Sequence, residues 1–320
     1  MGASQKSVQY AGEGAPDCQC LRILTVIWKK WSERAALATG NFVKLFDQRE
    51  VPPLPQASAR LLTMCRDESA DISELAKLIA GDVALSAKVL RTINSAYFGL
   101  SHKVTSVQHA IAMMGLRRLG PLVTAFVLSQ RVPLKAPGFD RVTFWQKSIQ
   151  RAVFAQNLAG HVAPGAEAEA FTGALLQDMA LPILLREWSE HYLPLVNLAE
   201  SEGRPLHEVE DEHLSWNHAQ AGAWMARNWS LPDILVCCVG LHHATLDEVR
   251  SLQCENTPIA AVAVSSRLPD VEVSCQKELL LTDEQFDELC QTTDAACAEL
   301  SCLFDVPSPD PLIRPCSHAC

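Results

Sequence analysis

Residues 79–99 read IAGDVALSAKVLRTINSAYFG, and their apolar side chains return at helical spacing. Leu85, Val89, Leu90 and Ile93 fall on one face of a helix, because positions three and four apart lie one above the other. Gly99 follows this run, as glycine often does where a helix ends. We therefore expect a helix that is closed by a turn.

The same spacing continues on both sides of this segment. Upstream, Asp71 and Glu74 form a capping-box-like start for another helix. Downstream, Ser106 can cap a further helix. Residues 116–128 are nearly all apolar, so we expect them at the centre of the first of two helical lobes. Glycine is scarce, and few β-branched residues alternate with polar ones. These features predict an all-α chain.

The composition excludes several classes of protein. The 320 residues are 48% hydrophobic and 20% charged, which is typical of a globular protein rather than a disordered one. The net charge of −10 opposes binding to a phosphate backbone, so no nucleic-acid partner is expected. No Gly-rich phosphate loop follows a strand, and no serine lies in a Gly-x-Ser-x-Gly elbow.

The chain contains 12 cysteines but no set of paired Cys-x-x-Cys motifs that would predict a zinc site. The N-terminus lacks the pattern of a secretory signal, and no apolar run reaches the ~18–20 residues that span a bilayer. We expect a cytoplasmic protein with reduced thiols. Small core positions are the favoured interpretation for five of these cysteines: Cys65, Cys237, Cys238, Cys290 and Cys297.

The chain divides into three parts. Residues 1–47 form an N-terminal extension, residues 48–268 a domain, and residues 269–320 a C-terminal helix with a tail that we expect to be disordered from Pro307. Two prolines and a glycine within residues 131–138 indicate a linker between two lobes, at about 48–130 and 140–268.

The N-terminal extension carries a basic amphipathic helix around Trp28 and Trp31. Such a helix can lie on a membrane or on a partner. More often it packs on its own domain, and we favour that interpretation, so membrane association is not expected.

Asp178 lies in the apolar run LLQDM, and His218, His242 and His243 follow downstream. One carboxylate and three imidazoles can hold one divalent ion. Hydrolysis by two bridged metals needs more ligands than these four. The structural alternative is that Asp178 accepts hydrogen bonds or pairs with Lys147, and we favour this alternative, with no cofactor.

Several motifs in order resemble the HDOD family, whose members are related to HD metal-dependent phosphohydrolases. They are Pro53-Leu-Pro55, the segment from Ile79 to Gly99 with Asp82, Asn94 and Ser95, the segment from Val104 to Leu116, Leu175-Leu-Gln-Asp178, His218-Ala-Gln-Ala-Gly222, Trp229-Ser-Leu-Pro232 and His242-His243. The resemblance covers residues 48–268. It implies a two-lobed helical fold, in which the second lobe resembles a degenerate HD domain.

The resemblance also identifies positions where metal ligands are replaced. The early histidine of an HD hydrolase falls on Lys147, the histidine of the His-Asp pair on Gln177, and the last aspartate near Ser266. Lysine repels a metal ion, and glutamine and serine are weak neutral ligands. The Gly-Tyr-Pro extension of cyclic-dinucleotide phosphodiesterases is also missing after His243.

The signature residues Asp82, Asn94, Ser95 and Gly99 allow two interpretations. They could form a surface for a ligand or a partner. We favour a structural role, because asparagine bonds to backbone groups at caps and turns, and small residues allow helices to pack closely.

Together these features predict a non-catalytic bacterial signal-transduction module that acts through protein–protein contacts. The expected partner is a regulatory protein such as a cyclic-dinucleotide turnover enzyme or a component of a histidine-kinase pathway. The alternative is a metal-dependent phosphohydrolase with a reduced ligand set and one divalent ion. A membrane-surface adaptor is the least favoured class.

Overall fold

The computed structural model describes residues 56–65, 70–94, 102–130, 133, 135–268, 279 and 281–312. Within these ranges every regular element is a helix, as the sequence predicts. The N-terminal extension with Trp28 and Trp31, as well as Ser95 and Gly99, lies outside the described residues, so their interpretations stay predictions.

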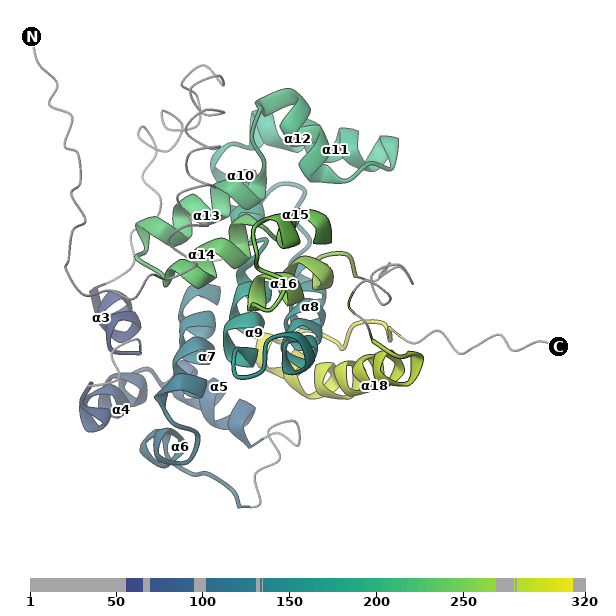
Figure 1. The fold of residues 1–320 in the computed structure, drawn as a ribbon. Helices are drawn as coiled ribbons and strands as arrows, with labels where there is room; N and C mark the ends of the chain where they lie inside the picture. The colour runs from purple at the N-terminus through teal and green to yellow at the C-terminus, as the bar shows by residue number, and fades with distance from the viewer. Residues whose placement is uncertain are drawn as a thin grey trace, which may run out of the picture.

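Five helices form the N-terminal part of the fold (Figure 1): α3 (Gln56–Met64), α4 (Ile72–Gly81), α5 (Val83–Ile93), α6 (Val107–Met114) and α7 (Leu116–Ser129). The predicted caps at Asp71 and Ser106 are confirmed. The Asp71 carboxylate accepts hydrogen bonds from the backbone N–H groups of Ser73 and Glu74, and Ser106 accepts one from His109.

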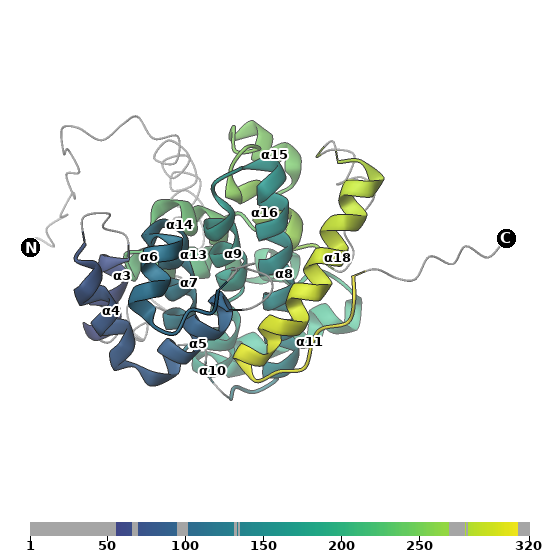
Figure 2. The same cartoon turned by 90° about the horizontal axis from the view of Figure 1, so that it is seen from below.

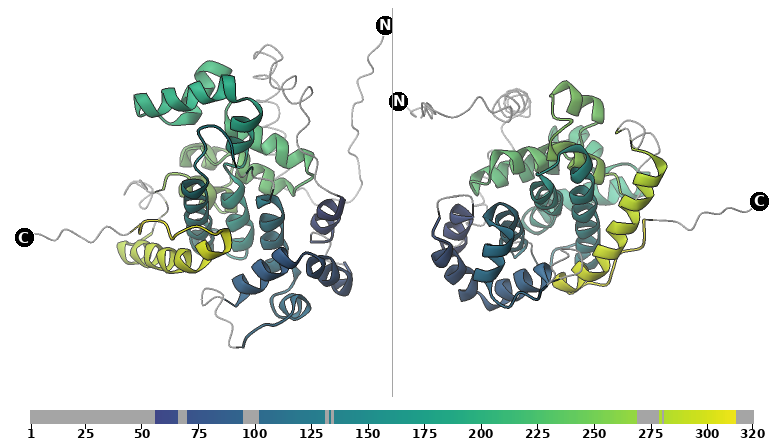
Figure 3. Two further views of the ribbon diagram at one scale, coloured as in Figure 1. Left: turned by 180° about the vertical axis from the view of Figure 1, so that it is seen from behind. Right: turned by 60° about the horizontal axis from the view of Figure 1, so that its bottom comes forward.

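A longer series of helices follows: α8 (Arg141–Val162), α9 (Glu167–Leu176), α10 (Ala180–Glu187), α11 (Ser189–Glu202), α12 (Leu206–Leu214), α13 (His218–Asn228), α14 (Asp233–Gly240), α15 (Leu246–Ser251), α16 (Pro258–Ser265) and α18 (Asp283–Leu300), with a 3-10 turn, η2 (Ser301–Phe304), after it. Helices α8 and α9 lie at the centre, and α11 and α12 project from one end (Figures 1 and 3).

One continuous apolar core joins the two groups of helices, because α7 packs directly on α9. Val123 and Phe126 of α7 and Val153 and Phe154 of α8 are almost fully buried. The division into two lobes, with a linker at residues 131–138, stays a prediction. The five cysteines expected in the core are buried, as predicted.

Residues 167–187, which include α9 and α10, are long and apolar enough to cross a membrane. However, 83% of the most apolar 18-residue stretch within them is buried inside the protein. This segment therefore lies mostly in the core of the described structure.

Asn94 has the structural role that we favoured. Its side-chain amide donates to the carbonyl oxygens of Leu90 at 2.8 Å and Val104 at 2.7 Å, and its Oδ1 accepts from the backbone N–H of Val104 at 2.7 Å. The side chain thus ties the end of α5 to the chain that enters α6.

Replacement of Asn94 by Ala is expected to lower the free energy of unfolding by about 1–3 kcal/mol, because backbone groups lose partners in a half-buried place. Urea unfolding measures this loss. Asn228→Ala is a matched control, since the side chain of Asn228 is exposed and donates one hydrogen bond, to Trp224 O, among the described residues. Equal effects of the two substitutions would contradict the structural role of Asn94.

The prediction of a disordered tail from Pro307 is wrong up to residue 312. Gln146 donates to the carbonyl oxygens of Pro307 and Ser308, both at 3.2 Å, and Gln150 donates to Asp310 O at 2.8 Å. Residues 307–310 therefore contact α8, the helix on which α18 also packs. The backbone N–H of Leu312 donates to Asp294 of α18, and Figure 2 shows this segment running back beside α18. Residues 313–320 are outside the described residues.

Candidate metal centre

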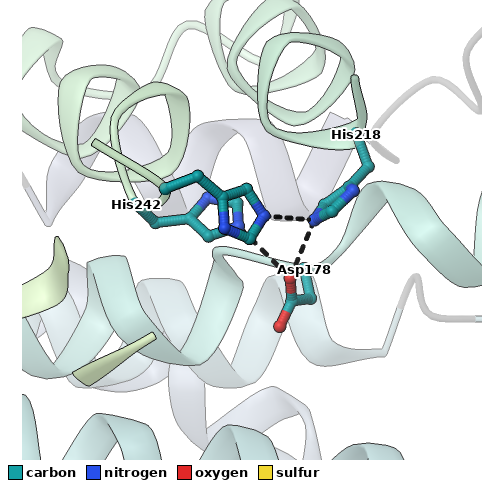
Figure 4. A group of neighbouring side chains, drawn as sticks. Asp178, His218 and His242 are labelled. Atoms are coloured by element: carbon teal, nitrogen blue, oxygen red, sulfur yellow. Dashed lines mark hydrogen bonds and ion pairs between the residues drawn. The ribbon is translucent and has the colours of Figure 1, made fainter. Parts of the chain in front are cut away.

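Three short connections bring the four predicted residues together. Asp178 lies in the turn between α9 and α10, His218 is the first residue of α13, and His242 and His243 follow the end of α14. Gly222 allows this close packing, because an added Cβ there would lie 2.8 Å from Val239 of α14. Figure 4 shows the side chains of Asp178, His218 and His242 pointing toward one another.

The four side chains offer ligand atoms that lie within 4.8 Å of one another. Asp178 Oδ1 is 3.3 Å from Nε2 of His218 and 3.3 Å from Nε2 of His242. His243 Nε2 is 2.8 Å from His218 Nε2. Three imidazole nitrogens and one carboxylate oxygen thus face the same point.

The outer nitrogens of two imidazoles are already bound. His218 Nδ1 lies 2.6 Å from Glu210 Oε2, and His242 Nδ1 donates to Val239 O at 2.7 Å. Such partners fix the ring and the tautomer of a metal-binding histidine, so that Nε2 is free to ligate. His242 Nε2 is buried and has no hydrogen-bond partner among the described residues.

Glu210, which contacts His218, is itself fixed by hydrogen bonds. It is 0% exposed, accepts the hydroxyl of Tyr192 on Oε1, and accepts the backbone N–H of His218 on Oε2 at 3.1 Å. A buried carboxylate is costly unless it is hydrogen-bonded, and these donors supply the bonds.

The other oxygen of Asp178 faces a cation of the protein itself. Arg151 of α8 forms an ion pair with Asp178 Oδ2, and the Gln177 amide N–H approaches the same oxygen at 3.4 Å. The predicted pairing of Asp178 with Lys147 is therefore wrong. Arg151 lies one helical turn beyond Lys147 and makes this pair instead.

This arrangement leaves only one oxygen of Asp178 for a metal ion. A carboxylate that bridges two metals uses both of its oxygens, and two-metal sites hold their ions ≈ 3.5–4 Å apart. A guanidinium group on Oδ2 repels a second cation from that place. The donor set therefore fits one divalent ion and does not fit a bridged pair on Asp178.

Charges within the cluster are strongly coupled. Burial disfavours a charge on His218, but the carboxylates of Glu210 and Asp178 outweigh burial and raise the pKa of His218 to about 10. Burial lowers the pKa of His242, and burial together with the neighbouring imidazoles lowers the pKa of His243 far below its ordinary value. In the metal-free protein, protonated His218 and Arg151 thus balance Asp178 and Glu210.

Asp178 is the anion that these cations share. Burial acts to raise the pKa of this carboxyl, but Arg151 and the nearby imidazoles of His218 and His242 hold it well below its ordinary value. Asp178 is therefore a carboxylate at neutral pH and can ligate a cation.

The cluster opens into a pocket with a volume of about 1000 Å³. Asp178, His218 and His243 line this pocket together with Lys147 and Ser266. Lys147 and Ser266 are two of the three positions where, according to the resemblance, HD hydrolases have a metal ligand and this chain does not. The third, Gln177, is 1% exposed, and its Oε1 has no partner among the described residues. The sequence thus predicted the four residues of the cluster, but it did not predict the contributions of Arg151, Glu210 and Tyr192.

Comparisons with known proteins agree with this fold. A crystal structure of an HDOD domain protein with unknown function from Geobacter sulfurreducens gives a TM-score of 0.63 at 20% identity, over 85% of this chain and 94% of that chain. A structure named as a candidate phosphohydrolase, from Shewanella amazonensis, gives 0.60 at 23% identity, over 82% and 92%.

A protein of Treponema pallidum, described only as uncharacterized, is 26% identical over 195 residues. The match covers 61% of this chain but only 38% of that protein, so this chain spans well under half of its length.

The helices and the Asp–His cluster define an all-α module related to HD domains. The model of the HDOD domain matches residues 51–245, which is more than half of the chain. The chain belongs to the HDOD domain family.

Proposed function

We propose that this protein is a non-catalytic regulatory module whose HD-related centre binds one divalent cation instead of running a two-metal reaction. The observation that carries the proposal is the pairing of Asp178 Oδ2 with Arg151, which leaves Oδ1 alone for a metal. Lys147, Gln177 and Ser266 supply no further carboxylate or imidazole to the pocket.

One cation fits the remaining donors. Asp178, His218, His242 and His243 would hold it, with Glu210 and Val239 O fixing two of the rings. A nitrogen-rich set suits a transition-metal ion better than Mg²⁺ or Ca²⁺, which prefer oxygen ligands. Bound there, the ion would supply positive charge beside the pocket.

A regulatory output requires a partner, and the HDOD resemblance implies one. The proposed partner is a cytoplasmic regulatory protein, such as a cyclic-dinucleotide turnover enzyme or a component of a histidine-kinase pathway. Binding of a ligand in the pocket would act on α11 and α12, because Val196 and Glu200 of α11 and Leu206 of α12 line it. Affinity capture from the native cell tests this part, which loses support if no regulatory protein is retained.

The rival function is a metal-dependent phosphohydrolase with a reduced ligand set. The convergence of the three imidazoles and Asp178 favours this rival, because one metal-bound water can suffice for some hydrolases.

Metal analysis and activity assays separate the two functions. We expect about one Zn²⁺ or Mn²⁺ per chain by calorimetry, and no turnover of a phosphodiester with Mn²⁺, Mg²⁺ or Fe²⁺. His242→Gln should weaken metal binding at least about tenfold, since it removes a ligand. His161→Gln is the control, because His161 is exposed at the end of α8. Two cations per chain, with turnover that is lost in His242→Gln, would establish the phosphohydrolase.

A further inference from the structure

The pocket above the Asp–His cluster is large enough for a whole small molecule. Its volume of about 1000 Å³ is at the upper end of the range for ligand sites. Residues from α8, α10, the α11–α12 connection and the segment after α16 line it. Part of the lining is apolar and includes Phe139, Phe144, Leu181, Leu185 and Val196.

One wall of this pocket carries polar groups at regular intervals. Thr143, Lys147 and Arg151 lie four residues apart along α8, so they share one face and rise by about 6 Å per step. Lys147 is exposed and forms no ion pair with any residue that the structure describes. Its ammonium group is therefore available to a ligand.

Arg151 is fixed in place beside it. The ion pair with Asp178 anchors one end of the guanidinium group, and the side chain of Arg151 lines the pocket with 18% of its surface exposed. A planar guanidinium group next to an exposed ammonium group is a suitable receptor for an oxyanion.

The other charged groups of the pocket are partly committed elsewhere. Arg204 pairs with Glu202 and Glu212, and Asp140 caps α8 by accepting hydrogen bonds from Val142 N and Thr143 Oγ1. Glu200 and Arg267 also line the pocket and carry opposite charges. Lys147 thus lines the pocket without an ion pair among the residues that the structure describes.

We propose that Lys147 and Arg151 bind the phosphate group of a small organic phosphate monoester, whose apolar body lies against the wall formed by Phe139, Phe144, Leu181, Leu185 and Val196. Lys147 occupies the position of a metal-binding histidine in HD hydrolases, so a protein cation replaces the ligand of a metal. The inference rests on the proposed function, in which the bound phosphate is sensed and not hydrolysed.

The test uses the full chain, freed of metal by a chelator, and follows the binding of phenyl phosphate and of inorganic phosphate by calorimetry. We expect phenyl phosphate to bind more tightly than inorganic phosphate, because its ring adds apolar contact. Lys147→Ala should weaken both at least about tenfold, which corresponds to ~1.4 kcal/mol, and Lys147→Arg should restore most of the affinity. Lys77→Ala, at an exposed lysine of α4 outside the pocket, should change nothing.

Wild-type affinity in Lys147→Ala, or no binding of phenyl phosphate to the wild-type chain at millimolar concentration, would overturn the inference. Binding that needs added Mn²⁺ and is insensitive to Lys147→Ala would assign the anion to the metal, and the inference would fail while the proposed function stood. Hydrolysis of phenyl phosphate by the metal-loaded protein would overturn the proposed function instead, even if binding still depended on Lys147.

Discussion

Replacement of Asp178 by Ala is expected to lower the free energy of unfolding by about 3–5 kcal/mol, because it removes one partner of a buried ion pair. Arg151 would lose its counter-ion, and His218 would keep Glu210 as its carboxylate partner. Asp178 is 8% exposed, so water cannot easily replace the lost partner. Urea unfolding at pH 7 in the presence of a chelator measures the loss without a contribution from metal.

Two further variants show whether the loss of stability in Asp178→Ala comes from the unpaired charge of Arg151. Asp247→Ala is the control, since Asp247 pairs with Arg250 but its side chain is 90% exposed, and we expect a loss of less than about 1 kcal/mol. Combining Asp178→Ala with Arg151→Met should restore part of the lost stability, because the unpaired cation is then also removed. Strict additivity of the two substitutions would contradict a direct ion pair.

The stability of the metal-free protein is expected to fall by about 2–3 kcal/mol between pH 6.5 and pH 9 through His218. The pKa of His218 is raised from 6.5 to about 10, so the folded state holds a proton that the unfolded state releases. The stabilisation is fully present below pH 6.5 and is lost as the pH rises through about 10. Urea unfolding at several pH values measures this decline.

The contribution of His218 is isolated by comparison with a variant. His218→Gln should be less stable at pH 6.5 and should show a flatter decline toward pH 9, whereas His161→Gln should follow the wild-type curve. A ring-proton titration of His218 by NMR gives an independent measurement. Parallel pH curves for the wild type and His218→Gln would show that the ring carries no extra proton in the folded state.

Local chemistry made much of the fold predictable. Ser106 and Asp71 cap helices because their side chains bond to backbone groups two or three residues away. Asn94 also bonds to backbone groups, four residues back at Leu90 and ten residues ahead at Val104. The path of residues 307–312 was not predictable, because it depends on Gln146 and Gln150 reaching backbone carbonyl groups about 160 positions along the chain. Such bonds have no local signature.

The candidate centre was predictable only where a motif identified it. Asp178, His218, His242 and His243 lie together as their order in the motifs indicated. Arg151 was not predicted, because the resemblance places the early histidine of HD hydrolases on Lys147, one turn earlier on the same helix face. Glu210 stands among Glu208, Asp211 and Glu212, and only tertiary packing buries it completely while leaving its neighbours nearer to water.

Phe304 contacts rings from both groups of helices: its centroid is 4.6 Å from that of Trp145 on α8 and 6.0 Å from that of Phe126 on α7. It lies almost 60 residues beyond the last position that the HDOD model matches. A recombinant fragment trimmed to the matched region would leave these two rings facing water and would tend to aggregate. The smallest unit that can be purified in a folded state should therefore extend to Leu312.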